Sequence, residues 1–192
     1  ANLAANAVSE TQIDLTWDAS TDNIAVTGYK VYKDGIFLAD NADTSYSATG
    51  LAAGTEYDFN VTAVDANDNE SAQSSTATET TLDTTDPSIP ANLSAVAVSS
   101  TVIDLTWDAS TDNVGVDHYR VFKDSVFLDN SASTSYSAGG LTPETSYEFT
   151  VSAVDAANNE SAESDPDSAT TPESASESVE EENYYIMRNR RR

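Results

Sequence analysis

Side chains able to bind a metal ion or move a proton gather in two short stretches, and each stretch occurs twice. The stretch WDASTDN begins at Trp17 and again at Trp107, and the related stretches DANDNES and DAANNES begin at Asp65 and Asp155. Carboxylates and amides packed this closely are able to ligate a cation, to act as catalytic acid and base, or to accept hydrogen bonds from their own loop backbone. The rest of the sequence narrows these three alternatives.

Catalysis is the alternative with the least support. The chain has no cysteine, and its only histidine is His118. A nucleophilic site would need Ser or Thr activated by this one histidine, which is more simply a surface strand residue. There is no glycine-rich phosphate loop and no HExxH-type helix. We therefore expect no enzymatic activity from this chain.

The charge of the chain excludes several classes of partner. It has 33 acidic and 8 basic residues, a formal net charge of -25. A polyanion repels nucleic-acid phosphates and anionic lipid headgroups, and no stretch approaches the ~20 apolar residues of a membrane span. We therefore expect neither nucleic-acid binding nor membrane insertion. Because the first residue is Ala1, we expect the chain to be a processed or excised piece of a longer protein.

The chain is a duplicated domain followed by a tail. Residues 1–81 align with residues 91–171 without a gap, and 49 of the 81 aligned residues are identical. A repeat of this length is a whole domain rather than a solenoid unit of ~20–50 residues. Residues 82–90 (LDTTDPSIP) contain two prolines and several turn formers, which predicts a short, stiff linker. Residues 172–192 form the tail.

Apolar residues inside each repeat alternate with polar ones, which is the period of a β-strand. In TQIDLTW, Ile13, Leu15 and Trp17 share one face, and in YDFNVTAVD a second alternating series begins at Tyr57. Asp-Gly in GYKVYKDGIFLAD is a hairpin turn signal. Several short strands separated by turns, with no amphipathic helix, predict an all-β fold. We expect two β-sandwiches in tandem and a C-terminal tail.

The combination of these motifs resembles the fibronectin type III family over residues 1–171. The resemblance rests on the inward Trp107, on YRVFKD, and on GLTPETSYEFTVSAVD with its counterpart GLAAGTEYDFNVTAVD. Tyr57 and Tyr147 match the family's tyrosine corner, in which the phenol hydroxyl bonds to the upstream backbone. The resemblance implies immunoglobulin-like sandwiches of the bacterial extracellular type, which are often found beside the catalytic domains of secreted polysaccharide-degrading enzymes.

This resemblance implies a non-catalytic spacer or interaction module of a secreted or cell-surface protein, with other protein domains or subunits as partners. Two alternatives remain open. One is a carbohydrate-facing accessory of a glycoside hydrolase, with polysaccharide as its partner, and the other is a self-assembling structural or adhesive subunit. Two small sandwiches offer no cleft large enough to hold a sugar between paired carboxylates, which again disfavours catalysis.

In the fibronectin-like arrangement, the loop after the Trp strand and the loop after the Tyr strand emerge at the same pole of each sandwich. Their oxygens would then lie close together, and Ca²⁺ takes six to eight oxygen ligands in flexible geometry, although the spacing is not that of an EF-hand. We interpret the loops either as Asx turns that need no cofactor or as a calcium site. The candidate calcium ligands are Asp18, Asp22, Asn23, Asp65, Asn69 and Glu70 in the first repeat and Asp108, Asp112, Asn113, Asp155, Asn159 and Glu160 in the second.

Each repeat is also expected to expose two aromatic rings. Strand alternation turns Tyr32 outward, and it turns Phe37 outward if Leu38 faces the core; Phe122 and Phe127 are their counterparts in the second repeat. Exposed rings stack on sugars or bury against another protein domain, and two neighbouring rings can simply pack together. All three alternatives remain open.

The tail differs in composition from the rest of the chain. Residues 172–182 are a Ser/Glu-rich linker that cannot bury a core. The residues that follow are apolar and then basic. They are typical of the start of a next domain or a processing remnant, or of a docking peptide that adds a strand to the sheet edge of a neighbouring copy, head to tail. The residues of this candidate docking strand are Tyr184, Tyr185, Ile186 and Met187.

Overall fold

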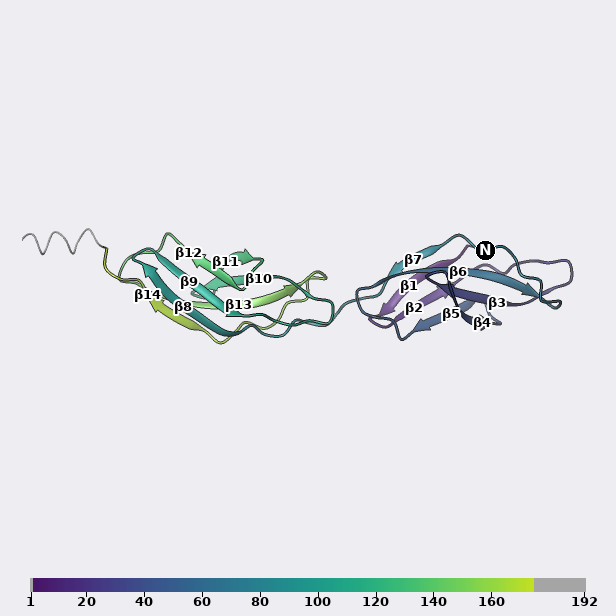
Figure 1. The fold of residues 1–192 in the computed structure, drawn as a ribbon, viewed down its shortest axis with the longest axis horizontal. Helices are drawn as coiled ribbons and strands as arrows, with labels where there is room; N and C mark the ends of the chain where they lie inside the picture. The colour runs from purple at the N-terminus through teal and green to yellow at the C-terminus, as the bar shows by residue number, and fades with distance from the viewer. Residues whose placement is uncertain (1, 175–192) are drawn as a thin grey trace, which may run out of the picture. The chain divides into compact units, whose positions relative to one another are not determined.

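The computed structural model describes residues 2–174, and the candidate docking strand at residues 184–187 lies outside them. The chain divides into two compact units, Ala1–Thr84 and Thr85–Arg192. The regular structure of the described residues consists of 14 strands (Figure 1). The all-β fold expected from the alternating pattern is therefore confirmed. Within the described part of the chain, no helix has the length and apolarity needed to cross a membrane.

The first unit is a sandwich of two antiparallel sheets. One sheet has the strand order β1-β2-β5 and the other has the order β4-β3-β6-β7. Both sheets are visible in Figure 1. The strands are β1 (Ala4–Ser9), β2 (Gln12–Thr16), β3 (Val26–Lys33), β4 (Ile36–Asn41), β5 (Ser45–Thr49), β6 (Glu56–Asp65) and β7 (Ala77–Thr80).

The second unit repeats this topology strand for strand. Its sheets have the orders β12-β9-β8 and β11-β10-β13-β14. The strands are β8 (Ala91–Ser99), β9 (Val102–Asp108), β10 (Val116–Lys123), β11 (Val126–Ser131), β12 (Ser135–Ala138), β13 (Ser146–Asp155) and β14 (Asp167–Thr170).

The core of each unit lies between its two sheets, and strand alternation supplies it. Ile13 and Leu15 on β2 and Phe59 on β6 are fully buried. Trp17, directly after β2, packs edge-on against Tyr29 of β3 with ring centroids 5.4 Å apart. The equivalent residues of the second unit form a second core, and the two cores share no residue. Each unit therefore has the hydrophobic interior that it needs to fold by itself.

The tyrosine corner implied by the family resemblance is present in both units. The Tyr57 hydroxyl accepts a hydrogen bond from the Ala52 backbone N–H at 3.0 Å. The Tyr147 hydroxyl accepts one from the Thr142 backbone N–H at the same distance, 3.0 Å. In each unit this bond fastens the preceding loop to the long strand, β6 or β13.

The ends of the predicted linker, residues 82–90, are bonded to the unit on their own side. The Thr84 backbone N–H donates to the Glu10 carboxylate at 2.9 Å. The Ser88 backbone N–H donates to the Thr111 carbonyl at 2.8 Å. The units therefore extend into the segment predicted as linker.

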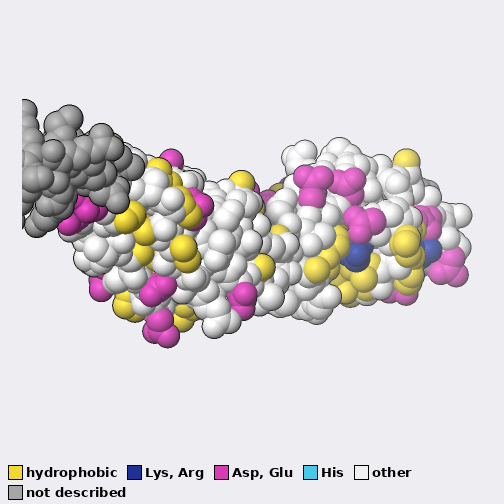
Figure 2. Space-filling view, turned by 60° about the vertical axis from the view of Figure 1, so that its left-hand side comes forward, with side chains coloured by type: hydrophobic (Ala, Val, Ile, Leu, Met, Phe, Trp, Pro, Cys, Tyr) yellow, Lys and Arg dark blue, Asp and Glu magenta, His cyan; other side chains and the backbone are white. Residues whose placement is uncertain are grey.

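The basic side chains of the described residues occupy equivalent places in the two units. Lys30 and Lys33 lie on β3, and Arg120 and Lys123 lie on β10. Each forms an ion pair with a carboxylate within 3.0 Å. Acidic side chains are spread more widely, and Figure 2 shows them in magenta around the dark blue lysines of the first unit. Within residues 2–174, the lysine and arginine side chains thus lie on one strand of each unit.

Candidate functional site

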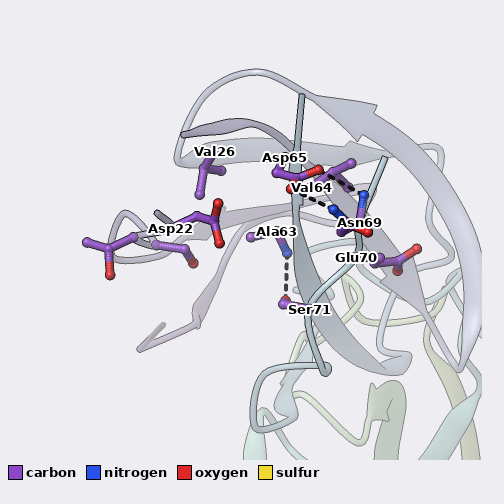
Figure 3. Close-up of a pocket in the computed structure, with 10 residues that line it drawn as sticks. Asp22, Val26, Ala63, Val64, Asp65, Asn69, Glu70 and Ser71 are labelled. Atoms are coloured by element: carbon purple, nitrogen blue, oxygen red, sulfur yellow. Dashed lines mark hydrogen bonds between the residues drawn. The ribbon is translucent and has the colours of Figure 1, made fainter. Parts of the chain in front are cut away.

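Polar side chains from both acidic loops of the first unit meet at one hollow of about 180 Å³. Its lining includes Asp22 from the loop after the Trp strand, and Asp65, Asn69 and Glu70 at the end of β6 and in the loop that follows. Figure 3 shows Asp22 across the hollow from Asp65 and Asn69. The two loops therefore emerge at the same pole, as expected from the family arrangement.

Asp65 is the last residue of β6, and its carboxylate organises the loop that follows. It is buried, with 8% of its surface exposed. One oxygen, Oδ1, accepts the backbone N–H groups of Asn67 and Asn69 at 2.8 and 2.9 Å. The other, Oδ2, accepts the side-chain amide of Asn69 at 2.8 Å. The Asn69 side chain first, and then the loop backbone, lower the pKa of Asp65 below its usual value.

Asp22 also accepts hydrogen bonds from its own loop. Its Oδ2 accepts the Ile24 backbone N–H at 2.9 Å. With its amide group turned to donate, the nitrogen of Asn23 lies 3.1 and 3.2 Å from the two Asp22 oxygens. Asp22 and Asn23 therefore form a local Asx-type turn, the arrangement in which such residues satisfy the backbone around them.

Glu70 lines the hollow, but its carboxylate faces the outer surface of the β4-β3-β6-β7 sheet. Lys30 Nζ donates to Oε2 at 2.7 Å, and the hydroxyls of Tyr32 and Thr62 donate to Oε1, each at 2.7 Å. The main chain places it there, because Glu70 forms an isolated antiparallel bridge with Val64 of β6. Lys30, and then the two hydroxyls, lower the pKa of Glu70 to about 2.

This carboxylate gives the first unit a specific sensitivity to acid. Its folded pKa of about 2 lies below the ordinary value of 4.5, so the unfolded chain binds the proton first as the pH falls. The stability contributed by Glu70 is therefore complete above about pH 4.5 and is lost as the pH falls toward about 2. We expect Glu70→Gln to flatten this part of the stability profile.

Urea denaturation across this pH range measures the effect in the first unit. In a Trp107→Phe background, Trp17 is the only tryptophan, and its fluorescence follows the first unit alone. Asp14, Asp34 and Asp65 also have lowered pKa values, but they are present with and without Glu70→Gln. The difference between the two plots of unfolding free energy against pH therefore isolates Glu70. Plots that run parallel for the two proteins would contradict the role assigned to this carboxylate.

The second unit repeats the acidic pole with the same roles. Asp155 is 2% exposed and accepts the backbone N–H and the side-chain amide of Asn159 at 2.8 and 2.7 Å. Asp112 Oδ2 accepts the backbone N–H groups of Val114 and Gly115 at 2.8 and 2.9 Å. These loop amides, that of Gly115 first, lower the pKa of Asp112. Carboxylate oxygens of Asp112 and Asp155 lie within 4.8 Å of each other, so the two loops again meet.

The remaining candidate ligands have positions of their own. Asp18 Oδ2 accepts the side-chain amide of Asn2 at 2.9 Å, and Asp108 Oδ2 accepts that of Asn92 at 2.7 Å. Each aspartate thereby connects the Trp strand to the residues at the start of its unit. Asn113 is exposed in the loop of Asp112.

Glu160 takes the place of Glu70 in the second unit. Its Oε2 accepts Arg120 Nη1 and its Oε1 accepts the Ser152 hydroxyl, each at 2.6 Å. The side chain thus joins an ion pair on the outer face of the sheet. Phe122 stands where the first unit has Tyr32, so the phenol hydroxyl that Glu70 accepts has no counterpart here.

The carboxylates at these poles mainly stabilise the turns of their own loops. Most of the loop carboxylates already accept hydrogen bonds from backbone amides or asparagine side chains, the pattern of self-satisfied Asx turns. One oxygen differs, because Asp112 Oδ1 is buried without a hydrogen-bond partner among the described residues. Calcium ligation at either pole stays a prediction. His118 pairs with its neighbour Asp117, with 2.8 Å between Nδ1 and Oδ2, and takes no part in the acidic poles.

The exposed aromatic rings form a second candidate site, which we call the aromatic face. In the first unit, Tyr32 and Phe37 make a T-shaped contact with centroids 6.0 Å apart. In the second unit, Phe122 and Phe127 make the same contact at 6.0 Å. Phe37 remains 50% exposed and Phe127 46% exposed. Tyr32 and Phe122 are half-buried, so Phe37 and Phe127 are the accessible rings of the two pairs.

Charged residues, which were not predicted to belong to it, complete the aromatic face. Lys30 stands two residues before Tyr32 on β3, so the same alternation that turns Tyr32 outward also places the Lys30–Glu70 ion pair beside it. In the second unit the Arg120 guanidinium lies over the rings of Phe122 and Phe127, 5.4 and 4.9 Å from their centroids. The alternation at i and i+2 was the signal that could have found these cations.

Comparison with known proteins places both units in one family. The profile described as "Fibronectin type III domain" matches residues 1–80 and 88–170. The chain is 41% identical to Chitinase A1 of Niallia circulans over 175 residues, which is 88% of the chain and 25% of that protein. It is 39% identical to Exoglucanase B of Cellulomonas fimi over 175 residues, or 88% of the chain and 16% of that protein.

Another relative matches the chain over a shorter stretch, of 74 residues. The chain is 50% identical to Chitinase D of Niallia circulans over 74 residues, which is 38% of the chain and 14% of that protein. The chain thus spans a quarter or less of the length of each of these relatives.

Proposed function

The chain belongs to the fibronectin type III family, and from this premise we propose that it is a non-catalytic spacer and interaction module of a secreted or cell-surface protein that degrades polysaccharide. The observation that carries the proposal is the match through both units to Chitinase A1 and to Exoglucanase B. Both matches cover 175 residues, and one relative is named a chitinase and the other an exoglucanase. A module found in both favours a role that does not depend on one particular substrate.

The interior of each unit supports a mechanical role. Both cores are filled by side chains from two sheets, and Ile13 and Ile103 are fully buried in equivalent positions. The ends of the connecting segment are bonded to the units at Thr84 and Ser88. Such a module keeps flanking domains apart with less conformational freedom than a flexible linker of equal length. The many exposed carboxylates keep it soluble.

A domain swap tests the proposed function. Residues 1–174 of this chain replace the matched 175-residue region of Chitinase A1. We expect the swapped enzyme to degrade insoluble chitin at close to the unmodified rate, and the enzyme with the region deleted to lose several-fold of that rate. A Gly/Ser linker of equal length is the matched control, and we expect it to recover only part of the loss. Hydrolysis of soluble oligosaccharides is expected to be equal in all four proteins.

The controls of the domain swap define the results that would overturn the proposed function. A swapped enzyme that performs like the deletion on insoluble chitin, while all proteins are equally active on soluble substrate, would overturn the proposal. The chain alone is added to chitin and cellulose in a parallel assay. Release of reducing sugar from either would contradict the non-catalytic assignment.

A further inference from the structure

We propose that the aromatic face of each unit is a contact platform for an insoluble neutral polysaccharide, on which exposed rings stack against the faces of sugar rings. The proposal rests on the proposed function and adds the surface and the class of glycan. The platform residues are Tyr32, Phe37, Lys30 and Glu70 in the first unit and Phe122, Phe127, Arg120 and Glu160 in the second.

The strand ladders position the ring pairs. β3 and β4 pair Tyr32 with Phe37, and β10 and β11 pair Phe122 with Phe127. Ile36 and Val126 are 73% and 67% exposed, but they pair with Lys33 and Lys123, so they belong to the opposite side of the sheet. The platform therefore consists of the ring pairs and the charged side chains beside them, at the same place in both units. Exposed apolar surface on a small soluble domain is typical of an interaction surface.

Polar groups lie beside the rings at positions suited to sugar hydroxyls. The side chains of Lys30 and Glu70 are 34% and 32% exposed, and Glu70 also accepts the Tyr32 hydroxyl at 2.7 Å. A pyranose has C–H groups on its faces, which pack on an aromatic ring, and hydroxyls at its edge, which bond to charged and polar side chains. The aromatic face offers both kinds of contact within one sheet surface.

The paired charges of the aromatic face favour a neutral ligand over a charged one. A polyanionic ligand would find each of the four basic side chains of the described residues already paired with a carboxylate within 3.0 Å. A basic partner would have to compete with these same cations for the carboxylates that already pair with them. A second copy of the chain carries the same net charge of -25 and is repelled. A neutral polymer encounters none of these penalties.

The two units differ in how much of the ring surface is free. In the second unit, the Arg120 guanidinium lies 4.9 Å from the Phe127 centroid and covers part of that ring. In the first unit, Lys30 is directed to Glu70, with 2.7 Å between Nζ and Oε2. We therefore expect the first unit to contribute more to binding than the second.

Depletion isotherms of the full chain on colloidal chitin and on microcrystalline cellulose test the platform. We expect the wild type to bind, and we expect Phe37→Ser/Phe127→Ser to bind at least tenfold more weakly. Phe37→Ser alone is expected to lose more than Phe127→Ser alone. Phe37→Tyr/Phe127→Tyr keeps the rings and is expected to keep binding. Since the substituted side chains are exposed, far-UV circular dichroism and the urea midpoints should show unchanged folds.

A matched pair of substitutions on the other sheet controls for surface hydrophobicity. Val8 on β1 and Val98 on β8 are 43% and 55% exposed and stand at equivalent positions. We expect Val8→Ser/Val98→Ser to bind as the wild type does. Equal binding of the Phe→Ser and wild-type chains would overturn the platform. No binding of the wild type to either polysaccharide, or sedimentation showing that the face pairs two copies of the chain, would also overturn it.

The platform and the spacer function can fail separately. The chain with Phe37→Ser/Phe127→Ser is also placed in the Chitinase A1 swap. If this enzyme still degrades insoluble chitin like the unmodified swap while the wild-type chain shows no depletion, the spacer function stands and the platform is wrong. If the unmodified swap itself fails while the chain binds chitin through its rings, the platform stands and the spacer function is wrong.

Discussion

Replacing Trp107 by alanine is expected to lower the unfolding free energy of the second unit by about 3–5 kcal/mol, the usual cost of removing a large buried ring. Trp107 is 5% exposed and contacts Tyr119 with centroids 5.3 Å apart. Its indole N–H has no hydrogen-bond partner among the described residues, so packing alone holds the ring. Since small domains have only about 5–15 kcal/mol of stability, the second unit becomes marginal.

The same substitution is expected to leave the first unit unchanged, because the two cores share no residue. In Trp107→Ala, Trp17 is the only tryptophan, so its fluorescence reports the first unit while far-UV circular dichroism reports both. We expect the fluorescence midpoint in urea to stay in place and the dichroism curve to gain an early transition. Trp17→Ala is the mirror control. A fluorescence midpoint that moves with Trp107→Ala would mean that the units do not unfold independently.

Replacing Asp65 by alanine is expected to destabilise the first unit by about 2–3 kcal/mol. The substitution removes the acceptor of two backbone N–H groups and one side-chain amide, at a residue only 8% exposed. Buried donors left without an acceptor cost about 1–3 kcal/mol. Asp65→Asn keeps one acceptor oxygen and is expected to cost less. Urea denaturation followed by Trp17 fluorescence in the Trp107→Phe background measures both variants, and far-UV circular dichroism of the same samples provides the unchanged second unit as the internal reference.

The wild type, Asp65→Ala and Asp112→Ala together test the calcium prediction. Extracellular calcium modules have dissociation constants of about 0.1–1 mM, so about 10 mM Ca²⁺ would stabilise such a site by about 1.4 kcal/mol or more. That corresponds to a rise of several degrees in the melting temperature of a domain of this size. A loop whose oxygens serve its own backbone predicts no such rise. A rise in the wild type that Asp65→Ala or Asp112→Ala abolishes would instead establish the metal.

Much of the fold could be predicted because strand alternation reports directly which residues are buried. Ile13, Leu15 and Trp17 lie in the core as their spacing predicts, and the tyrosine corner forms at Tyr57. Leu38 is different, because it is 37% exposed rather than turned into the core. The ladder pairs Val31 with Ala39 and Tyr32 with Phe37, so Leu38 is the extra residue of a β-bulge. Simple alternation does not hold at a bulge.

The candidate site was predictable to the level of loops but not of side chains. The family arrangement places the loops of Asp22 and Asp65 at one pole, and the structure agrees. It gave no indication that Asp18 would bond to Asn2, or that the Glu70 carboxylate would turn to Lys30. These choices depend on which donors lie within reach in three dimensions, and a one-dimensional pattern does not contain that information.

The most direct test of the spacer assignment is the ratio of insoluble to soluble chitin hydrolysis in the Chitinase A1 swap, measured against the deletion and the Gly/Ser linker. We predict that the swap with residues 1–174 keeps a ratio close to that of the unmodified enzyme and above both controls. A ratio no higher than that of the Gly/Ser linker would show that the folded sandwiches contribute nothing that a flexible chain does not, and would contradict the assignment.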